Sequence, residues 1–393
     1  MLPNLTSLSP NKDLLRQADV LVVGAGFYGS TMAETLAANG FRVVLIDQRN
    51  HIGGNAHSSF DSETGIEVHT YGPHLFHTSN KAVWDYVQRF SAFTSHQLRV
   101  FAQRAGQIYP LPINLATMCQ FFGRALSPSE AQELIRAQGA ELNGQPPRNL
   151  EEKAIALVGR PLYDAFIRGY TIKQWQKDPR ELPASIITRL PVRYDFNSRY
   201  FSDVYEGLPQ DGYAALFHRM LDHPNISVHL GIDYFDLKPD VPDTLVTIYS
   251  GPIDRYFSFR DGMLNWRSLK FEKEILPIGN FQGTGIMNYS DETVPWTRIV
   301  EYRHFHPERQ HSKDKTVIVK EFPSAVGPSA DPYYPVGTYE DAKCYLNYRA
   351  RADAEKNVVF GGRLGSYRYL DMHQAIASAL KDSISIAERL ASR

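Results

Sequence analysis

Short apolar runs near the start of the chain flank a segment with helical spacing. Residues 20–23 form an unbroken apolar run, which has the length of a strand buried on both faces in a parallel sheet. Residues 30–39 have helical character and end at Gly40, and residues 41–46 form a second apolar run that Asp47 closes. The order strand, helix, strand predicts a βαβ unit of the Rossmann type.

The pattern changes further along the chain. Residues 101–114 are typical of paired strands, and residues 116–169 become amphipathic and helical. A short apolar run at 358–360 and an apolar-striped helix at 370–390 indicate a return to the first sheet. In between, five strand-like runs separated by turns predict an antiparallel sheet. These runs are 227–230, 245–249, 270–275, 298–304 and 316–322.

The first strand and helix are joined by the glycine motif GAGFYG at residues 24–29. In such a motif Gly24 turns the chain, Gly26 lets the backbone approach a pyrophosphate, and Gly29 lets the helix pack on the strand. The free N–H groups at the helix start are expected to face the phosphates. Asp47 is expected to accept hydrogen bonds from ribose hydroxyls. A glycine-rich turn without a ligand is the simpler alternative, and the unit alone fits NAD as well as FAD.

Two further glycine segments favour FAD over NAD. Gly53, Gly54 and Asn55 follow Asp47 with a spacing that resembles the glutathione-reductase type of FAD proteins. Residues 361–365, GGRLG, form a late glycine-rich segment of the kind that lies beside the ribityl chain and pyrophosphate in those proteins. Because both segments match and lie far apart in the sequence, we expect FAD as the cofactor.

Composition narrows the class of protein. The 393 residues are 43% hydrophobic and 12% aromatic, which fits a globular protein of two or three domains. The net charge of −1 gives no electrostatic reason to expect nucleic acid or an acidic membrane as a partner. Cys119 and Cys344 have no metal-binding spacing, no apolar run reaches about 18 residues, and the N-terminus lacks the pattern of a secretory signal. We therefore expect a cytoplasmic protein without membrane insertion or nucleic-acid binding.

Three histidines lie close together in the sequence, at positions 69, 74 and 77. A metal site is one interpretation, but no cysteine or acidic cluster accompanies them, and a Gly-Pro turn interrupts their spacing. We expect no metal. Histidines that lie near a flavin edge, where they tune its redox state or orient its ring, explain the segment better.

Aromatic and basic residues alternate between positions 166 and 200. Rings can stack on a nucleobase, and guanidinium groups such as that of Arg189 can pair with phosphate oxygens. Residues 176–185 contain two prolines and several charges, as a surface loop does. From composition alone, a nucleotide-binding segment and an ordinary surface both remain open.

Nine segments together resemble the bacterial type of UDP-galactopyranose mutase, over nearly the whole chain beyond its N-terminal extension. They are GAGFYGS (24–30), IGGNA (52–56), YGPHLFHT (71–78), GYTIKQW (169–175), ELPASIITRLPVR (181–193), GTGIMNY (283–289), TRIVEYRHF (297–305), YYPV (333–336) and GGRLGSYRYLDM (361–372).

The resemblance implies that the protein interconverts UDP-galactopyranose and UDP-galactofuranose with reduced FAD and without net redox change. The flavin N5 would attack the anomeric carbon and displace UDP, the sugar would open through an iminium, and the ring would reclose in the other size. It also implies a homodimer, an unidentified reductant, and a product used in cell-surface glycans.

The resemblance also assigns roles to residues by matching position. Arg189 and Arg298 are implied as the catalytic diphosphate clamps that stabilise charge on departing UDP. Ile167 stands where other members have a second aromatic residue, so more of the stacking on uracil is left to Tyr170. A substrate-binding role is implied for Phe166, Ile167, Tyr170, Thr171, Trp175, Arg189, Tyr200, Asn288, Arg298, Tyr334 and Tyr369. A cofactor-binding role is implied for Gly24, Gly26, Phe27, Asp47, Gly54, Asn55, His74, His77, Gly362, Arg363, Tyr369, Asp371 and Met372.

We therefore expect an α/β fold that combines a Rossmann-type FAD-binding domain, an inserted helical domain and an antiparallel-sheet substrate domain. A mobile lid is expected around residues 174–190, where it would bring Arg189 to the substrate. The expected ranges are 1–17 for an N-terminal extension, 18–80, 205–235 and 350–393 for the FAD-binding domain, 81–204 for the helical domain, and 236–349 for the substrate domain.

Two other functions use the same features. A flavin oxidoreductase of the amine-oxidase type would share the FAD fold and the late glycine segment, but it would not need several arginines and tyrosines around a diphosphate. A non-catalytic module that binds UDP-sugar or FAD would show no requirement for reduced flavin. The fold alone does not decide among these functions.

Overall fold

The apolar runs near the N-terminus form the centre of a parallel sheet. The computed structural model describes residues 5–187, 191–325 and 331–392. The first sheet has the strand order β1-β10-β3-β2-β11-β17, and all neighbouring strands are parallel. Its strands are β1 (Leu5–Thr6), β2 (Val20–Val23), β3 (Val43–Asp47), β10 (Ile226–Leu230), β11 (Val246–Tyr249) and β17 (Val358–Phe360).

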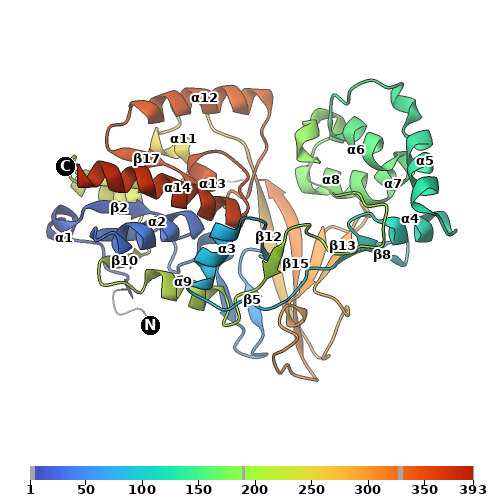
Figure 1. Cartoon of the computed structure of the whole chain (residues 1–393), viewed down its shortest axis with the longest axis horizontal. Coiled ribbons are helices and arrows are strands. Elements are labelled where there is room, and N and C mark those ends of the chain that lie inside the picture. The colour runs from blue at the N-terminus through green and yellow to red at the C-terminus, as the bar shows by residue number, and fades with distance from the viewer. Residues whose placement is uncertain (1–4, 188–190, 326–330, 393) are drawn as a thin grey trace.

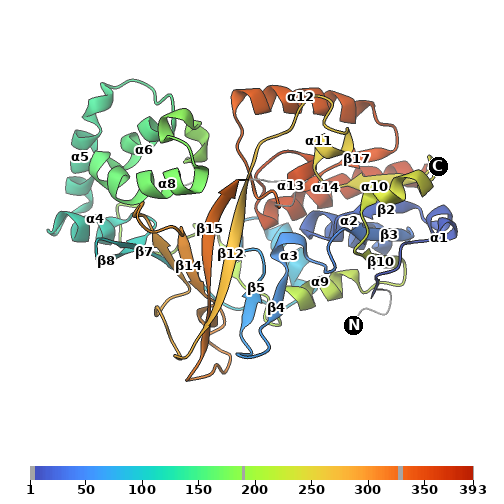
Figure 2. The same cartoon turned by 180° about the vertical axis from the view of Figure 1, so that it is seen from behind.

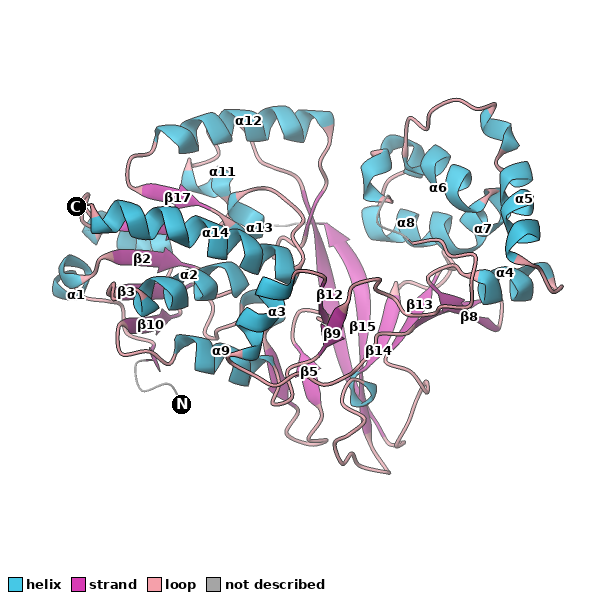
Figure 3. Ribbon diagram, viewed as in Figure 1, coloured by secondary structure: helices cyan, strands magenta, loops and turns pink. Residues whose placement is uncertain are grey.

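Helices cover both faces of this sheet (Figures 1 and 3). Val20 and Val22 of β2 join a core with α2, α9 and α14, whereas Leu21 and Val23 join a second core with α10, α11 and α12. Successive side chains of a strand point to opposite faces, so a strand covered on both sides is apolar throughout. The helices of this part are α1 (Lys12–Gln17), α2 (Phe27–Ala38), α3 (Lys81–Gln88), α9 (Tyr213–Leu221), α10 (Tyr234–Leu237), α11 (Ile253–Tyr256), α12 (Tyr339–Ala354), α13 (Gly362–Gly365) and α14 (Met372–Ala391).

A second sheet has the strand order β16-β12-β15-β14-β13-β7-β8. Its neighbours are antiparallel except for the parallel pair β13 and β7. Its strands are β7 (Val100–Arg104), β8 (Gln107–Leu111), β12 (Trp266–Leu276), β13 (Ile286–Tyr289), β14 (Arg298–Glu301), β15 (Thr316–Ala325) and β16 (Tyr334–Pro335). Two short antiparallel pairs complete the strands, β4 (Ser58–Phe60) with β5 (Glu67–His69) and β6 (Phe76–Thr78) with β9 (Tyr205–Gly207).

A helical part lies at the opposite end of the molecule from the parallel sheet, with the second sheet between them (Figures 1 and 2). The side chains of Asn114, Ser127 and Asn149 cap three of its helices, and Pro128 occupies the first turn of one of them. Its α-helices are α4 (Leu115–Phe122), α5 (Pro128–Gln138), α6 (Leu150–Val158), α7 (Arg160–Leu162) and α8 (Arg168–Trp175). A π-helical turn, η3 (Tyr163–Ile167), joins α7 to α8.

The structure corrects one prediction about the sheets. The runs at 227–230 and 245–249 were expected in the antiparallel sheet, but they form β10 and β11 of the parallel sheet. A short apolar run has the same pattern in either kind of sheet, so only its pairing partner decides. The predicted runs at 20–23 and 358–360 are confirmed as β2 and β17, whereas α2 begins at Phe27, earlier than expected.

Residues 5–17 of the predicted N-terminal extension are part of the fold. Strand β1 pairs with β10, and Leu15 of α1 is buried in the core on one face of the parallel sheet. The residue limits of the three expected domains stay a prediction. No helix in the described part of the chain combines the length and apolarity needed to cross a membrane.

A substitution at Gly29 tests how closely α2 packs on β2. A Cβ at this position would lie 1.8 Å from the Gly24 carbonyl oxygen and 3.2 Å from Val22 Cγ1. We expect Gly29→Ala to lower the free energy of unfolding of the apoprotein by about 1–3 kcal/mol in a denaturant titration, because helix and strand must separate. The control is Gly26→Ala, whose Cβ would come no closer than 3.8 Å to a neighbour. Equal stability of the two variants would contradict the packing argument.

Candidate functional site

The glycine turn after β2 forms one wall of a cavity of about 250 Å³. Gly24 has a φ of +106°, a conformation that other residues rarely adopt, and a Cβ there would lie 2.2 Å from the Ser250 hydroxyl oxygen. Gly26 is the N-cap of α2, and no side chain caps the helix there. The N-terminal amides of a twelve-residue helix therefore face the cavity without a side-chain acceptor, which suits phosphate oxygens.

Asp47 lines this cavity and also holds its wall together. One carboxylate oxygen accepts a hydrogen bond from the backbone N–H of Ala25 at 2.7 Å, and the other accepts from the N–H of Arg49 at 2.8 Å. Burial raises the pKa of the carboxyl group, and the two backbone donors act in the opposite direction. Asp47 thus fixes the turn before any ligand binds, and its contact with ribose hydroxyls stays a prediction.

The predicted cofactor residues divide between two cavities. The cavity beside the glycine turn contains Gly24, Gly26, Phe27, Asp47, Gly54, Asn55 and Gly362. A larger cavity of about 430 Å³ contains His77, Tyr369 and Asp371. Three predicted cofactor residues, His74, Arg363 and Met372, line both cavities. A long dinucleotide held at the glycine turn would therefore extend to the larger cavity.

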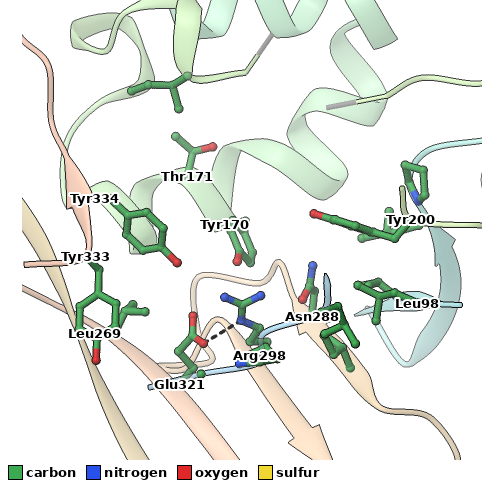
Figure 4. Close-up of a pocket in the computed structure, with 18 of the residues that line it drawn as sticks. Leu98, Tyr170, Thr171, Tyr200, Leu269, Asn288, Arg298, Glu321, Tyr333 and Tyr334 are labelled. Carbon is green, nitrogen blue, oxygen red and sulfur yellow. Dashed lines mark hydrogen bonds and ion pairs between the residues drawn. The ribbon is translucent and has the colours of Figure 1, made fainter. Parts of the chain in front are cut away.

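The larger cavity has an ion pair at its floor, in which Glu321 is buried and Arg298 is partly buried (Figure 4). Arg298 Nε donates a hydrogen bond to Glu321 Oε2 at 2.8 Å, and the Glu321 side chain is 1% exposed. The two residues face each other across strands β14 and β15. Burial opposes the charge of Arg298, but Glu321 holds the pKa of the guanidinium above its usual value. The cation is therefore permanent, and its far side is directed into the cavity (Figure 4).

Tyrosine hydroxyls surround this cation. Figure 4 shows Tyr170, Tyr200 and Tyr334 with their hydroxyl groups directed toward the space above Arg298. Burial raises the pKa of Tyr170 to about 12 and also raises the pKa of Tyr200 and of Tyr334. All three phenols stay protonated at neutral pH, so they can donate hydrogen bonds to an anion.

Two helical segments form the wall opposite this floor. Phe166 and Ile167 lie on the π-helical turn η3, and Tyr170, Thr171 and Trp175 lie on α8; all line the cavity. The Phe166 ring packs edge-on against Tyr109 at 4.9 Å between centroids, which fixes it from behind. The wall is therefore apolar at η3 and carries a hydroxyl group at Tyr170.

The three histidines considered for a metal do not form one group. His69 is buried in an aromatic core beside Tyr302 and Phe305, with ring centroids 5.2 and 5.6 Å away. His77 Nδ1 bonds to Asp203 at 2.6 Å, and its ring stacks on Phe201 at 3.6 Å between centroids. One atom each of His77, Asp371 and His373 lie within 4.8 Å of one another, a grouping that the sequence did not indicate. The expected absence of a metal stays a prediction.

The structure brings most of the predicted substrate residues together. Asn288 and the residues named on the wall and floor line the larger cavity, as does Tyr369, which stacks on Tyr334 at 5.6 Å. Arg189 lies outside the described residues. The sequence missed Glu321, because its role depends on facing Arg298 across β14 and β15, and no local motif shows that register.

The parallel sheet and its glycine turn define a Rossmann-type nucleotide-binding protein. A family model described as an NAD(P)-binding Rossmann-like domain matches residues 22–90. The model for UDP-galactopyranose mutase matches residues 165–369, which include the helical wall and the Arg298 floor of the larger cavity. The chain belongs to the UDP-galactopyranose mutase family.

Relatives of known name match the chain over almost its full length. The probable UDP-galactopyranose mutase of Klebsiella pneumoniae is 42% identical over 367 residues, 93% of this chain and 94% of that protein. The dTDP-fucopyranose mutase of Escherichia coli is 41% identical over 369 residues, 92% of this chain and 96% of that protein. A crystal structure of a reduced UDP-galactopyranose mutase shares the fold, with a TM-score of 0.72 at 14% identity over 94% of this chain and 93% of that chain.

A substitution at Gly26 tests whether the cavity beside the glycine turn binds FAD. We expect Gly26→Ala to weaken FAD binding by about 10-fold or more, because a Cβ would occupy the space into which the pyrophosphate must come. The measurement is titration of the apoprotein with FAD, followed by flavin fluorescence. The control is Gly139→Ala, which lies outside both cavities, has a φ of −87° and would bring its Cβ no closer than 3.4 Å to a neighbour; it should keep its FAD affinity. Unchanged binding by Gly26→Ala would place the cofactor elsewhere.

Proposed function

We propose that the protein interconverts UDP-galactopyranose and UDP-galactofuranose with reduced FAD, without net redox change. The observation that carries the proposal is the junction of the two cavities at His74, Arg363 and Met372 in a chain of this family. A cofactor that binds the glycine turn would meet, at this junction, a substrate that binds Arg298. An amine oxidase would not need this cationic, phenol-lined floor.

The residues of the first cavity fit FAD. The uncapped N-terminus of α2 suits the pyrophosphate, and Gly26 leaves room for it. Gly361 packs against the ring of Tyr28, where a Cβ would lie 2.1 Å from the ring, so the late glycine segment lies directly beside the first. When bound and reduced, the cofactor supplies the nucleophile that displaces UDP from the anomeric carbon.

In this proposal the protein holds and stabilises the leaving diphosphate. Glu321 binds Arg298 through Nε, so the outer nitrogens of the guanidinium can address two phosphate oxygens. Tyr170, Tyr200 and Tyr334 add neutral donors around the same space. Because Glu321 balances the charge of Arg298, a diphosphate needs a further cation, and Arg189 on the predicted lid is the residue we assign to that role.

The apolar end of the wall takes the nucleobase in this proposal. Phe166, Ile167 and Ile187 are each at most 7% exposed and line the cavity. A flat pyrimidine can be buried there, while Trp175 and the lid exclude water from the sugar and the reduced cofactor. We assign His74 and His77 to the cofactor end of the larger cavity; His74 supports this assignment because it lines both cavities.

Several further features belong to the same proposal. We assign the protein to the cytoplasm as a homodimer that receives electrons from an unidentified reductant and supplies galactofuranose for cell-surface glycans. The dTDP-fucopyranose mutase of Escherichia coli supports dTDP-fucopyranose as a second candidate substrate, since its identity of 41% is close to the 42% of the Klebsiella protein.

The deciding experiment incubates the FAD-loaded protein with UDP-galactofuranose, once oxidised and once reduced with dithionite, and separates the products by chromatography. We expect UDP-galactopyranose only in the reduced sample, with the flavin still reduced afterwards. The same assay with dTDP-fucopyranose tests the second candidate substrate. No conversion of either nucleotide sugar by a protein that retains FAD would overturn the mutase proposal and favour an oxidoreductase.

Substitutions at Arg298 test whether the floor of the larger cavity binds the diphosphate. We expect Arg298→Ala to keep its FAD and to lose about 10²–10³-fold in kcat, because the cation that stabilises departing UDP is gone. Arg298→Lys, which keeps a charge but cannot contact Glu321 and two oxygens together, should recover only part of the loss. Flavin absorbance per protein is measured beside turnover. Loss of FAD from Arg298→Ala would show that this arginine belongs to the cofactor site.

A further inference from the structure

A lysine ammonium lies inside a cage of backbone carbonyls behind the site. Lys173 belongs to α8, and its Nζ lies 2.6 Å from the carbonyl oxygen of Tyr289, 2.9 Å from that of Asp291, 3.0 Å from that of Val294 and 2.9 Å from that of Trp296. All four carbonyls come from the segment between Asn288 and Arg298. An ammonium has three donors, so this cage uses every N–H of the group.

The caged segment connects two residues of the cavity. Asn288 at the end of β13 precedes it, and Arg298 at the start of β14 follows it; they face each other in the β13–β14 register. On the other side of the cage, α8 carries Tyr170 and Trp175, which line the same cavity. Lys173 therefore joins the wall that we assign to the nucleoside to the floor that we assign to the diphosphate.

Close packing around the cage leaves little freedom between the two walls. A Cβ on Gly169 would lie 2.3 Å from the Ser290 carbonyl oxygen, so helix and loop are in direct contact at this point. Arg168 also pairs with Glu292 of the loop at 2.7 Å, but both side chains are about half exposed, and such a pair contributes little. The Lys173 ammonium, which is partly buried, is the stronger link between helix and loop.

The positive charge is essential to this geometry. Within the described residues, Lys173 makes no ion pair with a carboxylate, and carbonyl dipoles take that place. Burial lowers the pKa of the ammonium to about 8, with Asp291 and Glu292 acting in the opposite direction. A neutral amine would have two donors, and its lone pair would face a carbonyl oxygen.

We propose that Lys173 is a positioning residue, an internal cation that holds the 289–296 segment on α8 and so sets Arg298 and Asn288 against Tyr170 and Trp175. The role of these cavity residues rests on the proposed function. The cage itself has the chemistry of a site for a monovalent cation, since four carbonyl oxygens at 2.6–3.0 Å suit ammonium or potassium. A small cation should therefore replace the lysine once its side chain is removed.

The test compares Lys173→Met with Lys173→Ala in FAD-loaded, oxidised protein. Methionine fills the space without a donor, whereas alanine leaves the space open. We expect both variants to bind UDP about 10-fold or more weakly by isothermal titration calorimetry, and to exchange the amide hydrogens of residues 289–296 faster. Ammonium or potassium chloride should restore Lys173→Ala toward the wild type and leave Lys173→Met unchanged, with sodium chloride as the ionic-strength control.

Different outcomes separate this proposal from the proposed function. If wild-type protein fails to bind UDP, the substrate assignment fails, and exchange of the 289–296 amides still decides the role of Lys173. If ammonium leaves Lys173→Ala unrestored, or if Lys173→Met matches the wild type in both measurements, the cation role is overturned. A stable fold of each variant is checked by its retained flavin.

The pH dependence gives a second readout. Wild-type affinity for UDP should fall above a pH of about 8, as the ammonium loses its proton, and this fall should be absent in Lys173→Met. The charged groups around the cage are Asp291 and Glu292 on the loop, Arg168 on α8, and Arg104 on β7, which lies 3.8 Å from Asp291. An identical pH profile in Lys173→Met would contradict the proposal.

Discussion

The ion pair between Arg298 and the buried Glu321 is the constraint on which the larger cavity depends. A guanidinium placed under a cavity floor loses hydration, and a carboxylate on the neighbouring strand compensates for that loss. The pair also needs a fixed register between β14 and β15, in which the two residues face each other. The second sheet therefore fixes the position of the Arg298 guanidinium. On the other edge of β15, its long antiparallel pairing with β12 holds that strand in place.

Three residues line both cavities and so connect them. His74 comes from the loop before β6, Arg363 from the late glycine segment, and Met372 from the first turn of α14. The Arg363 guanidinium is held by the carbonyl oxygens of Tyr333 and Leu370, at 3.2 and 2.7 Å. Tyr333 adjoins Tyr334, and both line the larger cavity, so the Arg363 side chain links the late glycine segment to the wall of that cavity.

The chemistry of the floor explains why this fold can serve a transferase-like reaction as well as an oxidation. Rossmann-type sheets bind dinucleotides in proteins of many functions, and the fold does not fix what happens at the far end of the cofactor. In the proposed function, that end of the cofactor meets the cation of Arg298 and three phenols that remain protonated. Such a floor can stabilise a departing diphosphate without moving a proton of its own.

The sequence by itself determined the nucleotide-binding unit, because that unit is local. The strand at 20–23, the glycine turn, the helix and Asp47 are contiguous, and hydrophobic period and glycine spacing record each of them. The helix caps Asn114, Ser127 and Asn149 are also local features, because each side chain accepts from a backbone N–H two or three residues further along the chain. Most of the residues that the family resemblance named line one of the two cavities, but they were found by matching motifs and not by physical derivation.

Only the tertiary structure decided which sheet received β10 and β11, and which residues met across strands. A short apolar run carries no information about its partner, and the pairing energy depends on contacts between residues distant in the chain. Glu321 and the Lys173 cage were hidden for this reason: one depends on strand register, and the other on four backbone carbonyls that no side-chain pattern reveals. The local period of apolar residues specifies helices and strands. Which charged side chains become buried is decided only when these helices and strands pack together.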